Sequence, residues 1–212
     1  MTIATLDFAH VHVAPPAGST DPRTMLLLHG TGGNERDLLE LGAAVAPGLR
    51  LLGVRGKVVE NGMPRFFRRF AEGVFDEADI IKRSAELAAF VPAAAAAYGF
   101  DASQVFALGH SNGANIAAAV MVLHPGVLAG GALLRAMFTL APATPPVLTG
   151  TRVLLAEGAL DPIVPRATVD KLTALLTDAG ADVTLHWEPT GHGLTQADVA
   201  VTKRWFTGAN AG

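Results

Sequence analysis

A serine between two glycines carries the clearest chemical signal in the sequence. Residues 109–113 read G-H-S-N-G, a G-x-S-x-G pattern, between a short apolar run at 105–108 and an alanine-rich segment of helical character. Strand, G-x-S-x-G and helix in this order predict a nucleophile elbow, a strand-to-helix turn so tight that only very small residues fit two positions before and after the serine. The pattern favours Ser111 as a nucleophile; a glycine-rich turn that happens to hold a serine is the alternative.

A serine hydroxyl is a weak nucleophile until a base takes its proton, so an imidazole must lie within hydrogen-bond reach. The sequence has seven histidines. His192 stands between two glycines after the last predicted strand, where its loop is free to reach over a sheet. A histidine in that setting is also typical of a surface loop. His10, His12 and His186 lie on predicted strands, and His124 ends the helix after the serine. His29 ends a strand in surroundings that look structural, and His110 adjoins the serine with a side chain expected to leave the turn in another direction.

A third group must hold the imidazole in one tautomer and stabilise its protonated form. Asp161 follows the strand predicted at 152–156 and lies between Ser111 and His192 in the chain, which gives the order Ser, Asp, His. Its loop should lie beside the elbow, which favours Asp161. An ordinary turn beginning at Asp161-Pro162 is the bland interpretation. The other acidic candidates are Glu157, Asp182 and Glu188.

Two backbone N–H groups complete the predicted chemistry as an oxyanion hole. One belongs to Asn112, directly after the serine, and the other is expected from the loop after an early strand. That loop reads H-G-T-G-G over 29–33, so the N–H of Thr31 is the candidate. A phosphate-binding loop is the alternative, but the segment lacks the Lys-Ser/Thr of a P-loop and the G-x-G-x-x-G spacing.

These residues need a scaffold in which strands alternate with helices. Apolar runs favour strands at 8–14, 25–28, 49–54, 105–108, 127–134, 152–156 and 183–187. Helical spacing favours helices at 35–46, 76–98 with an interruption at Pro92, 112–123, 165–179 and 196–206, and 55–75 resembles a long loop. The alternation predicts an α/β fold with a mostly parallel central sheet, helices on both faces, and ligands at the carboxyl ends of the strands.

Composition narrows the class further. The 212 residues suit one domain, 1–212, and half of them are hydrophobic. A net charge of −3 favours neither nucleic acid nor a membrane surface. There is no cysteine, which excludes disulfides and fits a cytoplasmic protein. Residues 1–13 lack the pattern of a signal peptide, and prolines break every long apolar stretch, so no membrane span is expected.

With these residues assembled, the chain resembles the phospholipase/carboxylesterase family of the α/β-hydrolase superfamily, which includes acyl-protein thioesterases and small bacterial carboxylesterases. The resembling segments are LLLHGTGGNERDLL, LLGVRGKVVENGMPRFFRRFAEGVFD, GHSNGANIA, GALDPIVP and the GH at 191–192. The second is most similar to bacterial MhqD-type hydrolases. The resemblance implies that Ser111, Asp161 and His192 form a catalytic triad and that Thr31 and Asn112 form the oxyanion hole. One departure is Asn112, where thioesterases usually have glutamine.

The expected activity is hydrolysis of small carboxylic esters through an acyl-enzyme, with no cofactor, no metal and no lid domain. Thioesterase or lysophospholipase action on longer acyl chains, and a non-catalytic binding module, are the alternatives. The expected partner is a small ester, and a homodimer is left open. The candidate substrate pocket consists of Phe66, Phe67, Phe70 and Ile163. Arg65, Arg68 and Arg69 could attract an acidic substrate. The alternative is that the phenylalanines only anchor the loop to the core and the arginines lie in solvent.

Overall fold

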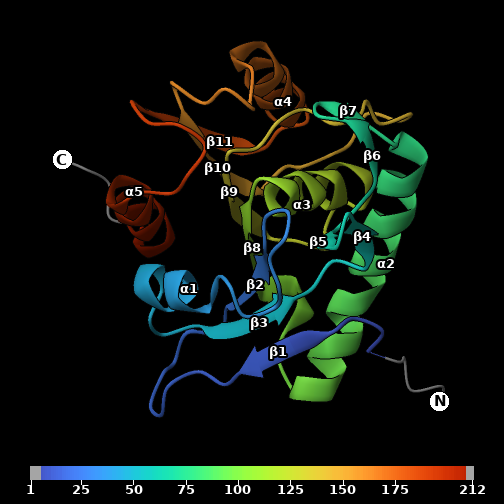
Figure 1. Ribbon diagram of the computed structural model, residues 1–212. Coiled ribbons are helices and arrows are strands. Elements are labelled where there is room, and N and C mark those ends of the chain that lie inside the picture. The colour runs from blue at the N-terminus through green and yellow to red at the C-terminus, as the bar shows by residue number, and fades with distance from the viewer. Residues whose placement is uncertain (1–5, 209–212) are drawn as a thin grey trace.

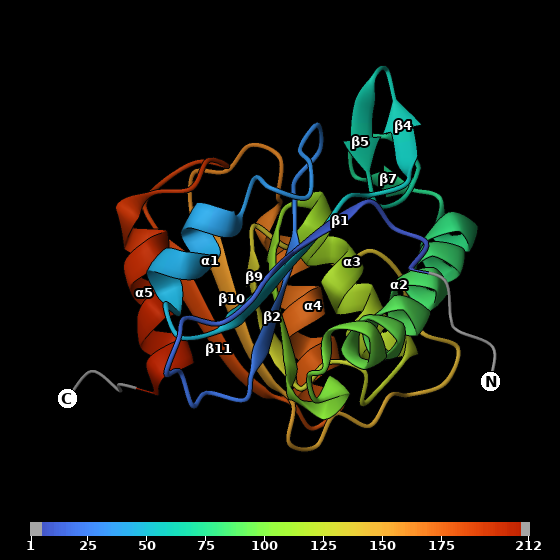
Figure 2. The same ribbon diagram turned by 90° about the horizontal axis from the view of Figure 1, so that it is seen from below.

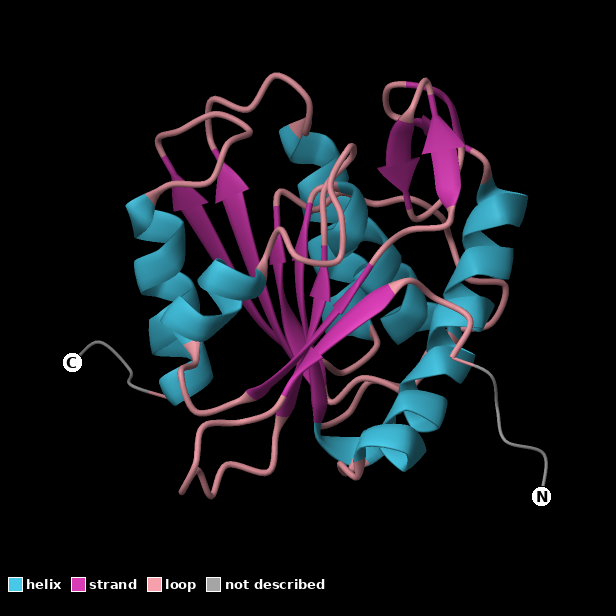
Figure 3. Cartoon of the chain, turned by 60° about the horizontal axis from the view of Figure 1, so that its bottom comes forward, coloured by secondary structure: helices cyan, strands magenta, loops and turns pink. Residues whose placement is uncertain are grey.

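A twisted, mostly parallel sheet forms the centre of the protein, which we describe from a computed structural model covering residues 6–208. The seven strands run in the order β1-β3-β2-β8-β9-β10-β11, and β1 alone is antiparallel to its neighbour. Their bounds are β1 His10–Val13, β2 Thr24–Leu28, β3 Arg50–Val54, β8 Val105–His110, β9 Gly130–Leu134, β10 Arg152–Gly158 and β11 Asp182–Glu188. Figure 3 shows these strands as a fan between helices. The predicted sheet is confirmed.

Five α-helices cover the two faces of the sheet (Figure 1). They are α1 Leu39–Val45, α2 Glu77–Tyr98, α3 Asn112–Leu123, α4 Arg166–Asp178 and α5 Gln196–Thr207, and a 3-10 turn covers Ala102–Gln104. Helices α1 and α5 pack together on one face, where Val45, Val201 and Trp205 belong to one apolar cluster. Helices α2, α3 and α4 cover the other face with a second, larger cluster. Both faces are therefore apolar, as expected for a parallel sheet.

The burial of the strands explains why their sequences are apolar without alternation. All five residues of β2 and of β9 are buried, and β10 is buried except at its first residue. A strand covered on both sides has no solvent-facing positions, so a continuous apolar run is the sequence that stabilises it. Helix α3 lies against β8 and β9 with eleven of its twelve residues buried, which places the alanine-rich segment in the core.

Helix α2 continues through Pro92, so the predicted interruption there is wrong. The helix begins with Asp76 accepting a hydrogen bond from the N–H of Asp79 and ends at Gly99, whose φ of 66° is the usual left-handed helix end. Proline costs the helix one backbone hydrogen bond. Phe90, Val91 and Ala94, which flank it, are buried in the large core cluster, and this packing stabilises the helix despite the missing hydrogen bond.

The segment predicted as a long loop at 55–75 contains two small hairpins instead. Strands β4 Val58–Glu60 and β5 Met63–Arg65 form one, and β6 Arg69–Ala71 and β7 Val74–Phe75 form the other. The first projects beyond the carboxyl ends of the central strands (Figure 2). Its turn is Asn61-Gly62, with φ of 51° and 80°. Asn-Gly between short strands is a strong hairpin signal, and it could have been found in the sequence.

Other differences lie at the ends of elements. The helix predicted from residue 35 begins at Leu39, because residues 34–38 form hydrogen-bonded turns, and the strand predicted from 127 begins at Gly130. Across residues 6–208, no helix combines the length and apolarity needed to cross a bilayer. In the same range no group of three or more metal-ligating side chains comes together. The part of the signal-peptide expectation that concerns residues 1–5 lies outside the described range.

Candidate active site

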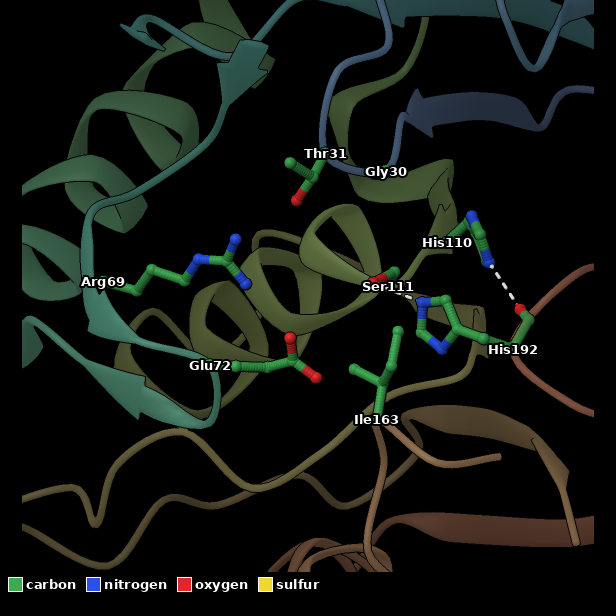
Figure 4. A pocket seen from close by; sticks show the side chains of 8 residues that line it. All are labelled: Gly30, Thr31, Arg69, Glu72, His110, Ser111, Ile163 and His192. Atoms are coloured by element: carbon green, nitrogen blue, oxygen red, sulfur yellow. Dashed lines mark hydrogen bonds between the residues drawn. The ribbon is translucent and has the colours of Figure 1, made fainter. Parts of the chain in front are cut away.

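A cavity of about 280 Å³ opens at the carboxyl ends of the central strands. Its walls come from the loops after β2, β8, β10 and β11 and from the β6–β7 hairpin, the places where an open α/β sheet binds its ligands. The residues that line it are Gly30, Thr31, Arg69, Glu72, His110, Ser111, Ile163 and His192 (Figure 4).

Ser111 occupies the sharp turn between β8 and α3. Its φ of 52° and ψ of −114° form a strained backbone conformation for a residue with a side chain. The turn also needs glycine on both sides. A Cβ on Gly113 would lie 1.9 Å from the carbonyl oxygen of Leu28, and one on Gly109 would lie 2.7 Å from the backbone of Ala114. The elbow geometry thus follows from the G-x-S-x-G spacing.

Ser111, His192 and Asp161 form a continuous hydrogen-bonded relay. The hydroxyl of Ser111 lies 2.9 Å from Nε2 of His192, and Nδ1 of His192 lies 2.7 Å from Oδ2 of Asp161. An ionised carboxylate only accepts, so Nδ1 carries the proton and Nε2 is left to accept from the hydroxyl. Three side chains distant in sequence therefore meet in the order that a nucleophile, a base and an orienting acid require.

The side chain of Asp161 is fully buried and held in place by its own loop. Its side chain is 0% exposed, and Oδ1 accepts hydrogen bonds from the N–H groups of Ile163 at 2.8 Å and Val164 at 3.3 Å. These bonds leave Oδ2 directed at His192. The carboxylate is thus aligned by its own loop, the turn beginning at Asp161-Pro162.

The alternative acids lie elsewhere. Asp182 begins β11 opposite Arg152, at the amino ends of the strands. Glu188 contacts His186 at 2.6 Å instead. Glu157 is buried in β10, where burial raises its pKa to about 9, so it is protonated at neutral pH.

The backbone N–H groups of Thr31 and Asn112 are the candidate oxyanion-hole donors, because Thr31 lines the cavity and Asn112 directly follows the serine. Asn112 is the first residue of α3, so its N–H lies at the positive end of the helix. Neither N–H donates to another group within residues 6–208. The side chain of Asn112 is buried and its Oδ1 accepts from the N–H of Phe66, so the carboxamide oxygen is engaged within the protein.

The Thr31 loop is fastened by the first hairpin and by a buried histidine. Arg65 Nη1 donates to Oγ1 of Thr31 at 2.6 Å, and the N–H of Gly32 donates to the carbonyl of Pro64 at 2.9 Å. His29 accepts the N–H of Gly56 through Nε2 at 3.0 Å, which fits the structural role predicted for it. The β4–β5 hairpin therefore sets the position of the loop that carries Thr31.

His110 lies in the cavity wall, whereas the sequence favoured a side chain directed away from the serine. Its ring centre is 5.3 Å from that of His192, and its Nε2–H donates to the carbonyl of His192 at 3.2 Å. Burial lowers the pKa of His110 to about 4, and the positive charge of Arg135 acts in the same direction. The ring is thus neutral at neutral pH and acts as a hydrogen-bond donor.

The predicted apolar pocket is wrong for its phenylalanines. Phe66 and Phe67 are buried in the large core cluster, and Phe70 is 75% exposed; none of the three lines the cavity. Ile163 does line it. Phe66 and Phe67 are adjacent in the segment that joins β5 to β6. Because both are buried, they anchor this segment to the core, which was the alternative to a pocket role.

Among the arginines, only Arg69 reaches the cavity wall. It pairs with Glu60 at 2.8 Å, and the cavity also presents the carboxylate of Glu72. Arg65 and Arg68 are paired with Glu60 and Asp76 respectively. The expected attraction of an acidic substrate is therefore offset by carboxylates.

The chain matches the family model described as Phospholipase/Carboxylesterase over residues 54–206. It belongs to this family of carboxylic ester hydrolases and has the α/β-hydrolase fold.

The chain is 43% identical over 187 residues to the hydrolase MhqD of Bacillus subtilis. The matched region covers 88% of this chain and 94% of that protein. The Bacillus cereus carboxylesterase structure is 45% identical, with a TM-score of 0.91 over 96% of this chain and 95% of that one. A carboxylesterase of Mesorhizobium loti is 33% identical, with a TM-score of 0.88 over 95% of both chains.

Proposed function

We propose that this enzyme hydrolyses small carboxylic esters through a covalent acyl-enzyme on Ser111. The observation that carries the proposal is the relay from the hydroxyl of Ser111 through His192 to Asp161, with contacts of 2.9 and 2.7 Å. The relay ends in a cavity, so a substrate carbonyl can reach the hydroxyl. Membership of a family of ester hydrolases supports the same reaction.

In the first half-reaction, Nε2 of His192 removes the proton of Ser111 as the oxygen attacks the ester carbonyl. The negative charge that develops on the carbonyl oxygen is stabilised by the free N–H groups of Thr31 and Asn112. Asp161 stabilises the imidazolium without taking its proton. The protonated His192 then donates to the leaving alkoxide, and the alcohol departs.

In the second half-reaction, water takes the place of the alcohol. His192 removes a proton from the water, the resulting hydroxide attacks the acyl-serine, and the same two N–H groups stabilise the oxyanion. Collapse of the intermediate returns the proton to the oxygen of Ser111 and releases the carboxylic acid.

The cavity supports a small substrate. Its volume of about 280 Å³ lies at the small end of ligand pockets, and it presents charged and polar groups opposite the serine. The phenylalanines that could have formed an apolar acyl tunnel are buried in the core or point to solvent. A long acyl chain has no comparable apolar surface within this cavity.

A chain-length series tests the proposal. We expect p-nitrophenyl acetate and butyrate to be hydrolysed with higher kcat/KM than the octanoate and palmitate esters, and acetyl thioesters to be no better than acetyl esters. Rates that rise with chain length would favour a thioesterase or lysophospholipase instead. A fluorophosphonate probe should label the wild type and not Ser111→Ala; absence of labelling and turnover together would leave a binding module.

A further inference from the structure

Three consecutive carbonyls around His192 each accept a hydrogen bond from a side chain at the end of another strand. His110 Nε2–H donates to the carbonyl of His192 at 3.2 Å (Figure 4). Arg135 donates to the other two, from Nε to Gly191 at 3.1 Å and from Nη2 to Gly193 at 3.0 Å. The backbone on both sides of the imidazole is thus fixed from the ends of β8 and β9.

Arg135 uses all five of its N–H donors inside the protein. Besides the two loop carbonyls, its Nη1 donates to the carbonyl of Ala156 at 2.9 Å, and its two Nη atoms bind the two oxygens of Asp198 at 2.8 Å each. Both charged side chains are 0% exposed. Since the guanidinium is planar, the bidentate pair fixes its orientation, and the orientation fixes the positions of the loop carbonyls.

The backbone of Arg135 is also joined to the nucleophile. Arg135 directly follows Leu134, whose carbonyl accepts the N–H of Ser111 at 2.8 Å. Its φ of 58° is uncommon for a residue with a side chain. Asp198 lies in the first turn of α5, where it forms a capping box with Thr195. One residue therefore connects the serine turn, the histidine loop and the start of the last helix.

We propose that Arg135, oriented by Asp198, is a positioning residue that holds the imidazole of His192 in register with Ser111. This inference rests on the proposed function, because it gives His192 the role of base. The loop between Gly191 and Gly193 has little conformational preference of its own, so the two arginine bonds restrict it. A buried ion pair is seldom needed for stability, since apolar residues of similar volume often replace it without loss.

The double variant Arg135→Met/Asp198→Asn tests the positioning role of Arg135 without leaving an unpaired charge in the core. The asparagine keeps an oxygen for the Thr195 cap, so we expect the folded protein to persist. With p-nitrophenyl acetate, we expect kcat to fall roughly 100-fold, as for a misplaced catalytic group, while KM changes by less than about three-fold. Arg23→Met is the matched control: it removes the pair with Asp21 and a bond to the carbonyl of Phe206, away from the cavity, and should leave kcat unchanged.

Proton NMR gives a readout that does not depend on turnover. The Nδ1 proton between His192 and Asp161 should give a far-downfield resonance in the wild type and in Arg23→Met. In the double variant we expect it to broaden or disappear, because a mobile loop exposes this proton to exchange with water. A purely structural role for the ion pair would lower the melting temperature and leave this resonance intact in the folded fraction.

A folded double variant with kcat within about two-fold of the wild type would overturn the proposal. If the double variant does not fold, Arg135→Lys provides the test. Lysine has three N–H donors but lacks the planar guanidinium, so we expect kcat to fall roughly ten-fold. An unchanged kcat in this variant would also overturn the proposal. Full turnover by Ser111→Ala would instead contradict the proposed function, and the resonance of His192 in the Arg135 variants would still report on the loop.

Discussion

At the scale of single residues, the relay depends on which nitrogen of His192 carries the proton. The contact of 2.7 Å with Asp161 fixes Nδ1 as the donor, so Nε2 is free to accept. An amide in place of the carboxylate can offer its NH₂ group to Nδ1 and favour the opposite tautomer. In the proposed mechanism, Asp161 therefore acts on the base by orienting it and not by taking its proton.

Replacing Asp161 by asparagine should therefore lower kcat by about 10⁴ with little effect on substrate binding. Replacing Ser111 by alanine should cost on the order of 10⁶. Steady-state kinetics with p-nitrophenyl acetate measures both. Asp182→Asn is the matched control, because Asp182 lies at the opposite ends of the strands. Equal activity of Asp161→Asn and the control would contradict the assignment.

The sequence predicts the three side chains of the relay, which the structure brings together, but it misses the residues that support them, for a physical reason. A strained serine turn requires glycines at fixed spacing, so Gly109 and Gly113 leave a local mark. Arg135 leaves none of that kind, since its partners lie 21 to 63 positions away. An arginine at the end of a buried apolar strand was the available signal, because a buried charge needs a partner.

At the scale of elements, the two hairpins between β3 and α2 have different relations to the site. The β4–β5 hairpin holds the loop of Thr31 through Arg65 and Pro64, and the β6–β7 hairpin supplies Arg69 and Glu72 to the cavity wall. Their short strands lack a long alternating pattern, so periodicity did not reveal them. The turn residues Asn61 and Gly62 did carry the signal.

Helix α2 gives a prediction about an element that is distant from the chemistry. Pro92 is exposed and lies inside a continuous helix, where alanine would restore a backbone hydrogen bond. We expect Pro92→Ala to raise the free energy of unfolding by about 1 to 3 kcal/mol, measured by urea denaturation. Esterase activity should not change, because Pro92 does not line the cavity. A lower free energy of unfolding in Pro92→Ala would contradict this expectation. It would indicate that the proline stabilises the protein mainly by reducing the conformational entropy of the unfolded chain.

At the scale of the whole molecule, the apolar strand runs and helical spacing predicted the layers of the fold. Because β2, β9 and β10 are buried on both faces, their sequences are continuous apolar runs. Such runs predict strands without knowledge of which strands they pair with. The order of the strands does not follow from such runs, because it depends on which neighbours pair across the sheet. The cavity was equally out of reach, since its walls come from five separate segments.

The stability of the molecule should respond to pH through Glu157. Burial raises its pKa from 4.5 to about 9, so the folded state keeps a proton that the unfolded state loses as pH rises above 4.5. Folding stability therefore declines between pH 5 and 8, and Glu157→Gln should remove that decline, gaining on the wild type by up to about 1 kcal/mol per pH unit. Urea denaturation at several pH values measures the difference; a constant gap between the two proteins would contradict it.

The unequal attachment of the two hairpins has a consequence for divergence within the family. Changes in β4–β5 disturb the loop that carries Thr31 through Arg65, so under the proposed mechanism we expect them to lower the rate with every substrate. The tip of β6–β7, with Glu72 facing the cavity and Gly73 at its turn, makes no such connection. New substrate preferences can therefore arise at this tip while the reaction machinery is inherited unchanged.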